Sequence, residues 1–215
     1  QRHRFHHKHM RLLAGLAIVG AVTALLLAVI YLRELVIAGG LVVGALALVH
    51  VLLAFWGKVR FGKEISVGLI YTTGVCFAPV LNRGTGISWF ELSFLAGLLL
   101  AAWLNLFMNS VIEYRVDRTD DQIFVLAKIS RVWVRRAVLY VSLAGTLVFA
   151  AVTVALAAQS DQLRQPAAYL ILALYCAVPG LVLRYERHLA PGGAYRIIAE
   201  WVFAVGLIVL LLPVE

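Results

Sequence analysis

Residues 12–32 read LLAGLAIVGAVTALLLAVIYL, a stretch that carries no charged side chain. A bilayer core about 30 Å thick needs roughly 20 apolar residues in a helix, and this run has that length. Backbone amides find no water in lipid, so a helix satisfies them all within the segment. The stretch therefore predicts a transmembrane helix, and it indicates that the chain is embedded in lipid rather than surrounded by water.

The composition of the whole chain supports a membrane protein. Of 215 residues, 63% are hydrophobic and only 14% are charged, whereas soluble domains have about 25% charged residues. Mean hydropathy is +0.93. Cys76 and Cys176 both lie in apolar runs, which predicts neither a disulfide nor a metal site. The expected fold class is an all-α polytopic transmembrane bundle, formed by residues 1–215 as a single domain.

Seven apolar runs divide the chain into candidate spans. They lie near 12–32, 34–56, 67–81, 89–112, 137–158, 167–183 and 201–213. Short loops keep Lys and Arg on the cytoplasmic side, and alternate connections here carry 16 basic residues on one side and 3 on the other. This separation predicts about seven crossings of the membrane, with the amino terminus in the cytoplasm.

The net charge of +8 follows from this topology and from attraction to anionic lipid head groups. Membrane lipid is therefore an expected partner, and nucleic acid is not needed to explain the charge.

The stretch that carries chemistry is LNLFMNSVIEYRVDRTDD, at 104–121. A polar side chain occurs at every fourth position: Asn105, Asn109, Glu113 and Asp117. On an α-helix this spacing drifts by about 40° per step, which predicts a slowly winding polar stripe on one face. Polar groups at membrane depth are costly, so we expect the stripe to face the bundle interior or a wet cavity.

Two carboxylates one turn apart favour a divalent cation, which makes Glu113 and Asp117 candidate metal ligands. Mg²⁺ binds to one or two carboxylates together with substrate phosphates, so a diphosphate is the expected guest. Asn105 and Asn109 are candidate substrate-binding residues beside it. Alternatively, the acidic residues are the solvated start of a loop, where they pair with basic neighbours.

A cytoplasmic amphipathic loop is expected at 113–136, where basic and apolar residues mix as in segments that lie on a membrane surface. Arg118 and Lys128 are candidate substrate-binding residues there, because their charge suits a diphosphate. A basic flank of the neighbouring spans explains them equally well.

Further along the chain lie three more polar residues, Tyr195, Arg196 and Glu200. They are expected on the cytoplasmic side of the membrane, as are Glu113 and Asp117. They are candidates for holding the anionic head of a substrate. Helix capping and interfacial anchoring are the competing explanations.

Three stretches resemble the UbiA superfamily of intramembrane prenyltransferases, and a divergent bacterial branch in particular. They are YTTGV at 71–75, LNLFMNSVIEYRVD at 104–117 and YRIIAEWVF at 195–203. The resemblance implies a nine-helix bundle whose two acidic motifs bind Mg²⁺ and the diphosphate of an isoprenoid donor. Asn109, Glu113 and Asp117 match the second motif, with Glu113 in place of its first Asp. The first two helices and the first motif are then absent, so the chain is either incomplete or a relative that has lost catalysis.

Two functions follow as hypotheses. The first is a Mg²⁺-dependent prenyltransferase, which transfers the prenyl group of a polyprenyl diphosphate to a lipophilic or aromatic acceptor. The second is a non-catalytic scaffold or accessory subunit of a larger membrane complex that binds lipid or pigment. The intact polar stripe favours the enzyme, and the missing first motif favours the scaffold. Gly40 and Gly44 form a G-x-x-x-G pattern, which indicates close helix contact within the bundle or with a partner subunit.

Overall fold

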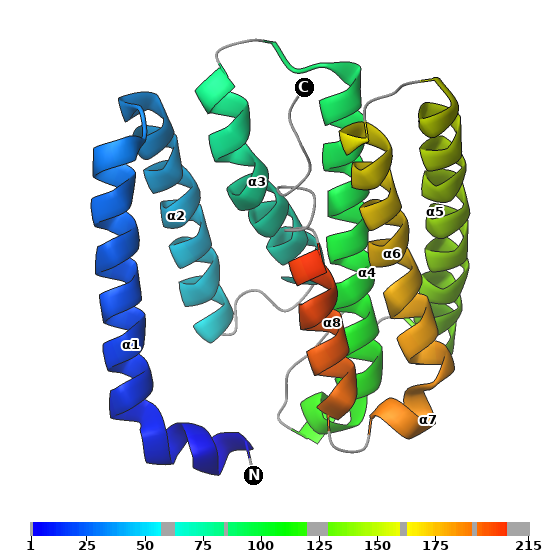
Figure 1. The fold of residues 1–215 in the computed structure, drawn as a ribbon. Coiled ribbons are helices and arrows are strands. Elements are labelled where there is room, and N and C mark those ends of the chain that lie inside the picture. Colours follow the sequence, from blue (N-terminus) through cyan, green and yellow to red (C-terminus); the bar gives the residue numbers. More distant parts are fainter. Residues whose placement is uncertain are drawn as a thin grey trace.

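The computed structural model describes residues 2–56, 63–83, 86–119, 129–159, 163–190 and 193–205. Within these ranges the chain is all-α, with no β-strand (Figure 1). The helices are α1 (Arg2–Tyr31), α2 (Glu34–Phe55), α3 (Lys63–Arg83), α4 (Trp89–Thr119), α5 (Arg131–Gln159), α6 (Arg164–Arg184), α7 (Glu186–Leu189) and α8 (Ala194–Ala204).

Six of these helices, α1 to α6, are long and apolar enough to cross a membrane. The predicted all-α bundle of transmembrane character is thus confirmed at this level. The predicted seventh span, 201–213, begins within α8, and its residues 206–213 lie outside the described part of the chain.

Four helices extend at least four residues beyond the apolar runs that predicted them. Helix α1 begins at Arg2 rather than at 12, and α3 begins at Lys63 rather than at 67. Helix α4 continues to Thr119, and α5 already begins at Arg131. The amphipathic loop expected at 113–136 is therefore wrong at 113–119 and at 131–136, which are helical. Residues 129–130 are not helical, and 120–128 lie outside the described residues. An apolar run marks the part of a helix that lies in lipid, whereas charged residues such as Glu and Arg continue the same helix with good propensity.

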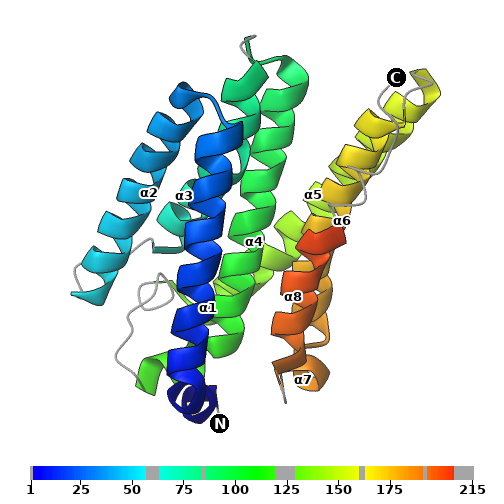
Figure 2. The ribbon, with the colours of Figure 1, turned by 60° about the vertical axis from the view of Figure 1, so that its left-hand side comes forward.

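The helices run alternately up and down in layers (Figures 1 and 2). Helices α1 and α2 lie at one edge, α3 and α4 in the middle, and α5 and α6 at the other edge. Helix α6 packs on both α4 and α5, and α8 packs on α6. The starts of α3 and α8 lie at the same end of the bundle as the end of α4, and this arrangement positions the candidate site (Figure 1).

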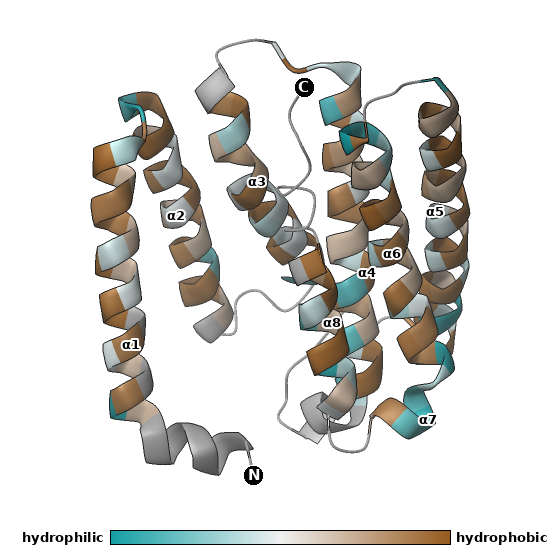
Figure 3. Cartoon of the chain, viewed as in Figure 1, coloured by the Kyte–Doolittle hydropathy of each residue, from teal (hydrophilic) through white to brown (hydrophobic). Residues whose placement is uncertain are grey.

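The core is built mainly from α4, α5 and α6. Met108 and Val111 of α4 are fully buried, as are Leu172, Cys176 and Leu183 of α6. By contrast, most apolar side chains of α1 are exposed, and the apolar colouring of Figure 3 extends over outward helix faces. Such an outer surface is suited to contact with membrane lipid.

Close helix contacts depend on individual glycines. A Cβ atom on Gly180 of α6 would lie 2.9 Å from Cβ of Ser142 on α5, and one on Gly39 would lie 2.0 Å from the Phe77 ring. By contrast, added Cβ atoms on Gly40 and Gly44 would meet nothing within 4 Å among the described residues. The helix contact expected at the G-x-x-x-G pattern is therefore made by Gly39, because neighbouring helical positions point about 100° apart.

Candidate functional site

The polar stripe of α4 forms as predicted at its first two positions. Asn109 lies one turn beyond Asn105, and its Nδ2 donates a hydrogen bond to Asn105 Oδ1 at 3.4 Å. Both side chains are half-buried. Because α4 is continuous to Thr119, Asp117 follows Glu113 by one turn in the same helix. The side chain of Asp117 lies outside the described part of the structure.

Glu113 is the centre of a three-residue cluster that joins α4 to α8. Its Oε1 atom accepts hydrogen bonds from the Tyr195 hydroxyl and from Arg196 Nε, each at 2.8 Å. Arg196 Nη2 lies 2.6 Å from the same oxygen. The structure therefore brings together three of the residues that the sequence singled out, although they come from segments 82 residues apart.

Tyr195 acts in this cluster as a neutral hydrogen-bond donor. Its side chain is 5% exposed. Burial, together with donation to the Glu113 carboxylate, raises the pKa of Tyr195 to about 12. Arg196 Nε also contacts the Tyr195 hydroxyl oxygen at 2.9 Å, and the guanidinium lies 5.5 Å from the centre of the phenol ring. The three groups thus form a compact, charge-neutral unit.

The remaining predicted site residues do not join this unit in the described structure. Glu200 is exposed on α8, one turn beyond Arg196, and makes no contact with Glu113. Arg118 belongs to the last turns of α4, but its side chain lies outside the described part. Lys128 falls in the range 120–128, which the structure does not describe.

A buried carboxylate that the sequence analysis missed lies beside the stripe. Glu64, in the first turn of α3, is 3% exposed, and its Oε1 accepts a hydrogen bond from Ser110 Oγ of α4 at 2.9 Å. Its Oε2 has no hydrogen-bond partner among the described residues. Glu64 lies outside the apolar run 67–81. The sequence carries one signal for this burial: Glu64, Gly68 and Thr72 are spaced four residues apart, which places them on one face of a helix. In the structure all three lie on the buried face of α3.

Two arginines near the start of α5 have structural partners. Arg131 lies 2.6 Å from Glu186 Oε1 and donates from Nε to the Val111 carbonyl oxygen at 2.9 Å. Arg135 donates to the Leu183 carbonyl oxygen at 2.9 Å. These contacts tie α5 to α4, α6 and α7. Arg131 and Arg135, two of the basic residues at 131–136, thus hold helix ends together.

An apolar groove of about 450 Å³ follows the seam between α3 and α4. Leu69, Thr72 and Phe77 line it from α3, and Leu92, Leu95 and Leu99 line it from α4. Leu69, the first of its lining residues, lies about one and a half turns beyond Glu64 along α3. Along α4, Trp103 follows the last groove residue, Leu99, and precedes Glu113. Its indole Nε1 donates to the Ile65 carbonyl oxygen of α3 at 3.1 Å.

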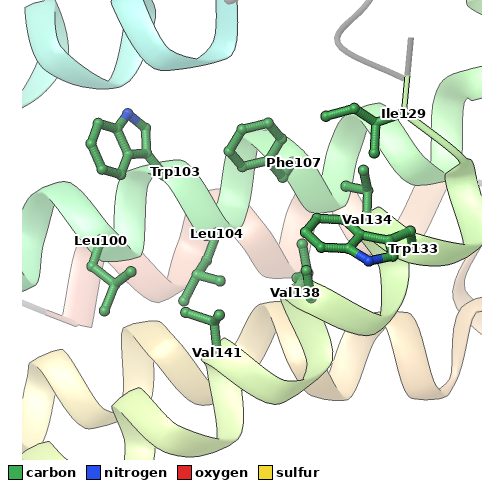
Figure 4. A pocket seen from close by; sticks show the side chains of 10 residues that line it. Leu100, Trp103, Leu104, Phe107, Ile129, Trp133, Val134, Val138 and Val141 are labelled. Atoms are coloured by element: carbon green, nitrogen blue, oxygen red, sulfur yellow. The ribbon is translucent and has the colours of Figure 1, made fainter. Parts of the chain in front are cut away.

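A second apolar cavity, of about 220 Å³, lies on another face of α4, against α5 (Figure 4). Phe107 of α4 and Trp133 of α5 are among its lining residues, all of which are apolar except for the indole nitrogens. The described residues of its lining therefore offer no charged group with which to orient a charged ligand.

Within the described part of the chain, no group of three or more His, Cys, Asp and Glu side chains is arranged to hold a metal ion. The carboxylate and amide oxygens of Glu64, Asn109 and Glu113 are nonetheless of the type that Mg²⁺ prefers. Comparison with known proteins found no matching family model, no matching curated protein and no matching solved structure.

Proposed function

We propose that this chain is an intramembrane protein of the prenyltransferase type that binds a polyprenyl diphosphate. The observation that carries the proposal is the succession of a polar cluster and an apolar groove along α4, with the cluster against α8 and the groove against α3. Glu113, Tyr195 and Arg196 would face the head group, and the groove between α3 and α4 would hold the prenyl tail. An amphipathic ligand with a charged head and an apolar tail fits this succession.

The proposed orientation places the polar cluster at the cytoplasmic side of a bacterial cytoplasmic membrane. Alternation of the helices supports it, since Arg131, Arg135 and Arg196 belong to one end of the bundle while Arg33 and Arg164 belong to the other (Figure 1). This agrees with retention of basic residues in the cytoplasm. With a seventh span completed by 206–213, the amino terminus would be inside and the carboxyl terminus outside.

We propose that Glu113 and Arg196 exchange each other for parts of the ligand when the head group binds. Without ligand, the negative charge of Glu113 is balanced by Arg196 at 2.6 Å. A diphosphate with its cation carries the same two signs of charge, so Arg196 can turn to a phosphate while Glu113 turns to the cation. Arginine suits this role because its planar fork pairs with phosphate as well as with carboxylate.

Mg²⁺ would be held by Glu113 together with Asp117, which follows one turn later on α4. When bound, the ion would neutralise the diphosphate and help it to leave. The chain's own residues would orient the head, through the Tyr195 hydroxyl and the stripe amides of Asn105 and Asn109. The resemblance of 71–75, 104–117 and 195–203 to the UbiA superfamily supports this class, with a lipophilic or aromatic acceptor.

A second candidate is a non-catalytic scaffold or accessory subunit that binds lipid or pigment. The specific observation in its favour is that Glu113 is already satisfied by Tyr195 and Arg196. These contacts would suffice to fasten α8 to α4 without any ligand. The cluster of Glu113, Tyr195 and Arg196 is therefore compatible with either function. A measurement of ligand binding distinguishes the two functions.

The deciding experiment measures Mg²⁺-dependent binding of a polyprenyl diphosphate to the purified chain. Glu113→Gln combined with Asp117→Asn should abolish metal-dependent binding, because both charges are lost while the introduced glutamine amide still accepts from Tyr195. Glu91→Gln is the matched control, since it removes a carboxylate from the first turn of α4 at the opposite end. Equal binding by the wild type and the double variant, or no binding by either, would overturn the proposal and favour the scaffold.

A further inference from the structure

Two segments, 131–136 and 184–188, form a basic corner at one end of the bundle, where α5 begins and where α6 leads into α7 (Figure 1). Direct contacts hold the two segments together. Arg131 Nη2 lies 2.6 Å from Glu186 Oε1, and Arg135 Nη2 donates a hydrogen bond to the Leu183 carbonyl oxygen at 2.9 Å. The basic corner is therefore defined by distances between its two segments, and not by their sequence alone.

The basic corner carries more positive charge than it neutralises. Its two segments contain five arginines but one carboxylate, that of Glu186. This carboxylate is already shared, because Arg135 Nε lies 3.6 Å from Oε2 while Arg131 contacts Oε1. The other three arginines are exposed, and none of them joins an ion pair within the described ranges: Arg136, Arg184 and Arg187. The corner thus keeps an excess of positive charge at its surface.

The three exposed arginines lie close to the contacts that fix the corner. Each directly follows a residue that makes one of those contacts, Arg135, Leu183 or Glu186, so its Cα lies about 3.8 Å from the Cα of that residue. Arginine carries its charge at the end of a long, flexible stem. Guanidinium groups from both segments can therefore turn towards one anionic group that lies over the corner.

Exposed aromatic and apolar side chains accompany these charges. Trp133 and Tyr185 are exposed within the two segments, and amphipathic rings of this kind gather at the level of lipid head groups. Leu143 follows Arg136 by two turns on the same face of α5, and Leu181 precedes Arg184 by one turn on α6; both leucines are exposed. Positive charge at the end of the bundle is thus continued along the helices by an apolar outer surface.

We propose that the basic corner is a docking surface for an anionic phospholipid. The exposed arginines would bind the lipid phosphate through charge-assisted hydrogen bonds, for which the planar guanidinium is well suited. The acyl chains would lie along the exposed faces of α5 and α6. Glu186 keeps Arg131 and Arg135 in place, so the surface exists before the lipid arrives.

This inference goes beyond membrane topology and does not depend on the proposed function. Retention of basic residues in the cytoplasm explains which side of a membrane they occupy, but it implies no preference among the lipids found there. The diphosphate proposal uses Arg196, which belongs to α8 and is paired with Glu113. None of the arginines of the basic corner takes part in that pair.

The test is native mass spectrometry of the purified chain in a neutral detergent, titrated with phosphatidylglycerol or with phosphatidylcholine. The chain should bind the first phosphatidylglycerol more tightly, because phosphatidylcholine has no net charge. Arg184→Gln combined with Arg187→Gln should weaken phosphatidylglycerol binding about 30-fold, and Arg136→Gln alone should weaken it about fivefold. The matched control, Arg33→Gln combined with Arg164→Gln, removes two arginines at the opposite end of the bundle and should leave this binding unchanged.

Equal affinity for the two lipids would overturn the inference, as would an equal loss in the control pair or no loss in Arg136→Gln. Displacement of the lipid by inorganic phosphate at the same concentration would also overturn it, because the acyl chains would then contribute nothing. The unmodified chain provides a measurement that no folding defect can obscure: its preference for phosphatidylglycerol should fall as salt is added, and a salt-independent preference would contradict recognition by charge. Diphosphate binding should be unchanged in Arg184→Gln with Arg187→Gln, so failure of either proposal leaves the other standing.

Discussion

Replacing Arg196 by methionine should loosen the docking of α8 on the bundle. Methionine keeps an apolar stem but removes the guanidinium, which provides two of the three contacts to Glu113 Oε1. Hydrogen bonds to charged groups contribute about 1.5–3 kcal/mol, whereas exposed ion pairs contribute about 0–1 kcal/mol. The two side chains are 33% and 26% exposed, so we expect an intermediate loss of about 2 kcal/mol.

The detachment of α8 can be followed by the reactivity of a cysteine at position 199. Ala199 is 2% exposed on the inner face of α8, so Ala199→Cys reacts with a maleimide chiefly when the helix leaves the bundle. A loss of about 2 kcal/mol raises the detached population, and with it the labelling rate, about 30-fold. Cys76→Ala removes a half-buried background thiol, while Cys176 is fully buried.

Arg187→Met is the matched control for this experiment. Arg187 is exposed at the same end of the bundle and takes part in no ion pair within the described structure. Its replacement should leave labelling at position 199 unchanged. The reasoning is refuted when Arg196→Met labels at the rate of the parent chain, because the ion pair then contributes nothing to holding α8.

Two further outcomes are expected. Gly180→Ala should reduce the free energy of unfolding by about 1–3 kcal/mol, because its Cβ would lie 2.9 Å from that of Ser142; thermal unfolding in detergent should show no such loss for Gly40→Ala. The pKa of Tyr195 is raised from 10.0 to about 12, so its stabilising effect is complete below pH 10 and is lost as pH rises to about 12. Tyr195→Phe should abolish that alkaline loss, and an unchanged pH profile would contradict the assignment to Tyr195.

The α4 stripe could be predicted because it depends only on local geometry. Positions four apart share a helix face in any α-helix, and the Asn109 to Asn105 hydrogen bond follows from that rule. The extension of the same helix to Thr119 was not predictable from hydropathy, which reports where lipid ends rather than where backbone hydrogen bonding ends.

The partners of the stripe residues were harder to predict because they depend on tertiary packing. Membrane topology put Tyr195 and Arg196 on the same side as Glu113, but many basic residues share that side. The packing of α8 in the folded bundle is what brings Arg196, rather than another basic residue, to Glu113, with Nη2 2.6 Å from Oε1. Glu64 was missed because the hydropathy pattern places it in a short, charged connection between spans, where an acidic side chain is usually solvated. In the structure it belongs to the first turn of α3 and is buried where α3 packs on α4.

The cluster at Glu113 also sets an order of events during biosynthesis. Its hydroxyl and guanidinium donors are encoded 82 and 83 residues downstream of the carboxylate. At about 5–20 residues per second, translation leaves Glu113 waiting for roughly 4–16 s before α8 emerges. During that interval α4 must rest in the membrane with its acidic end in contact with water or with the insertion machinery. The hydrogen bonds and the ion pair that join α4 to α8 can therefore form only after α8 has been synthesised.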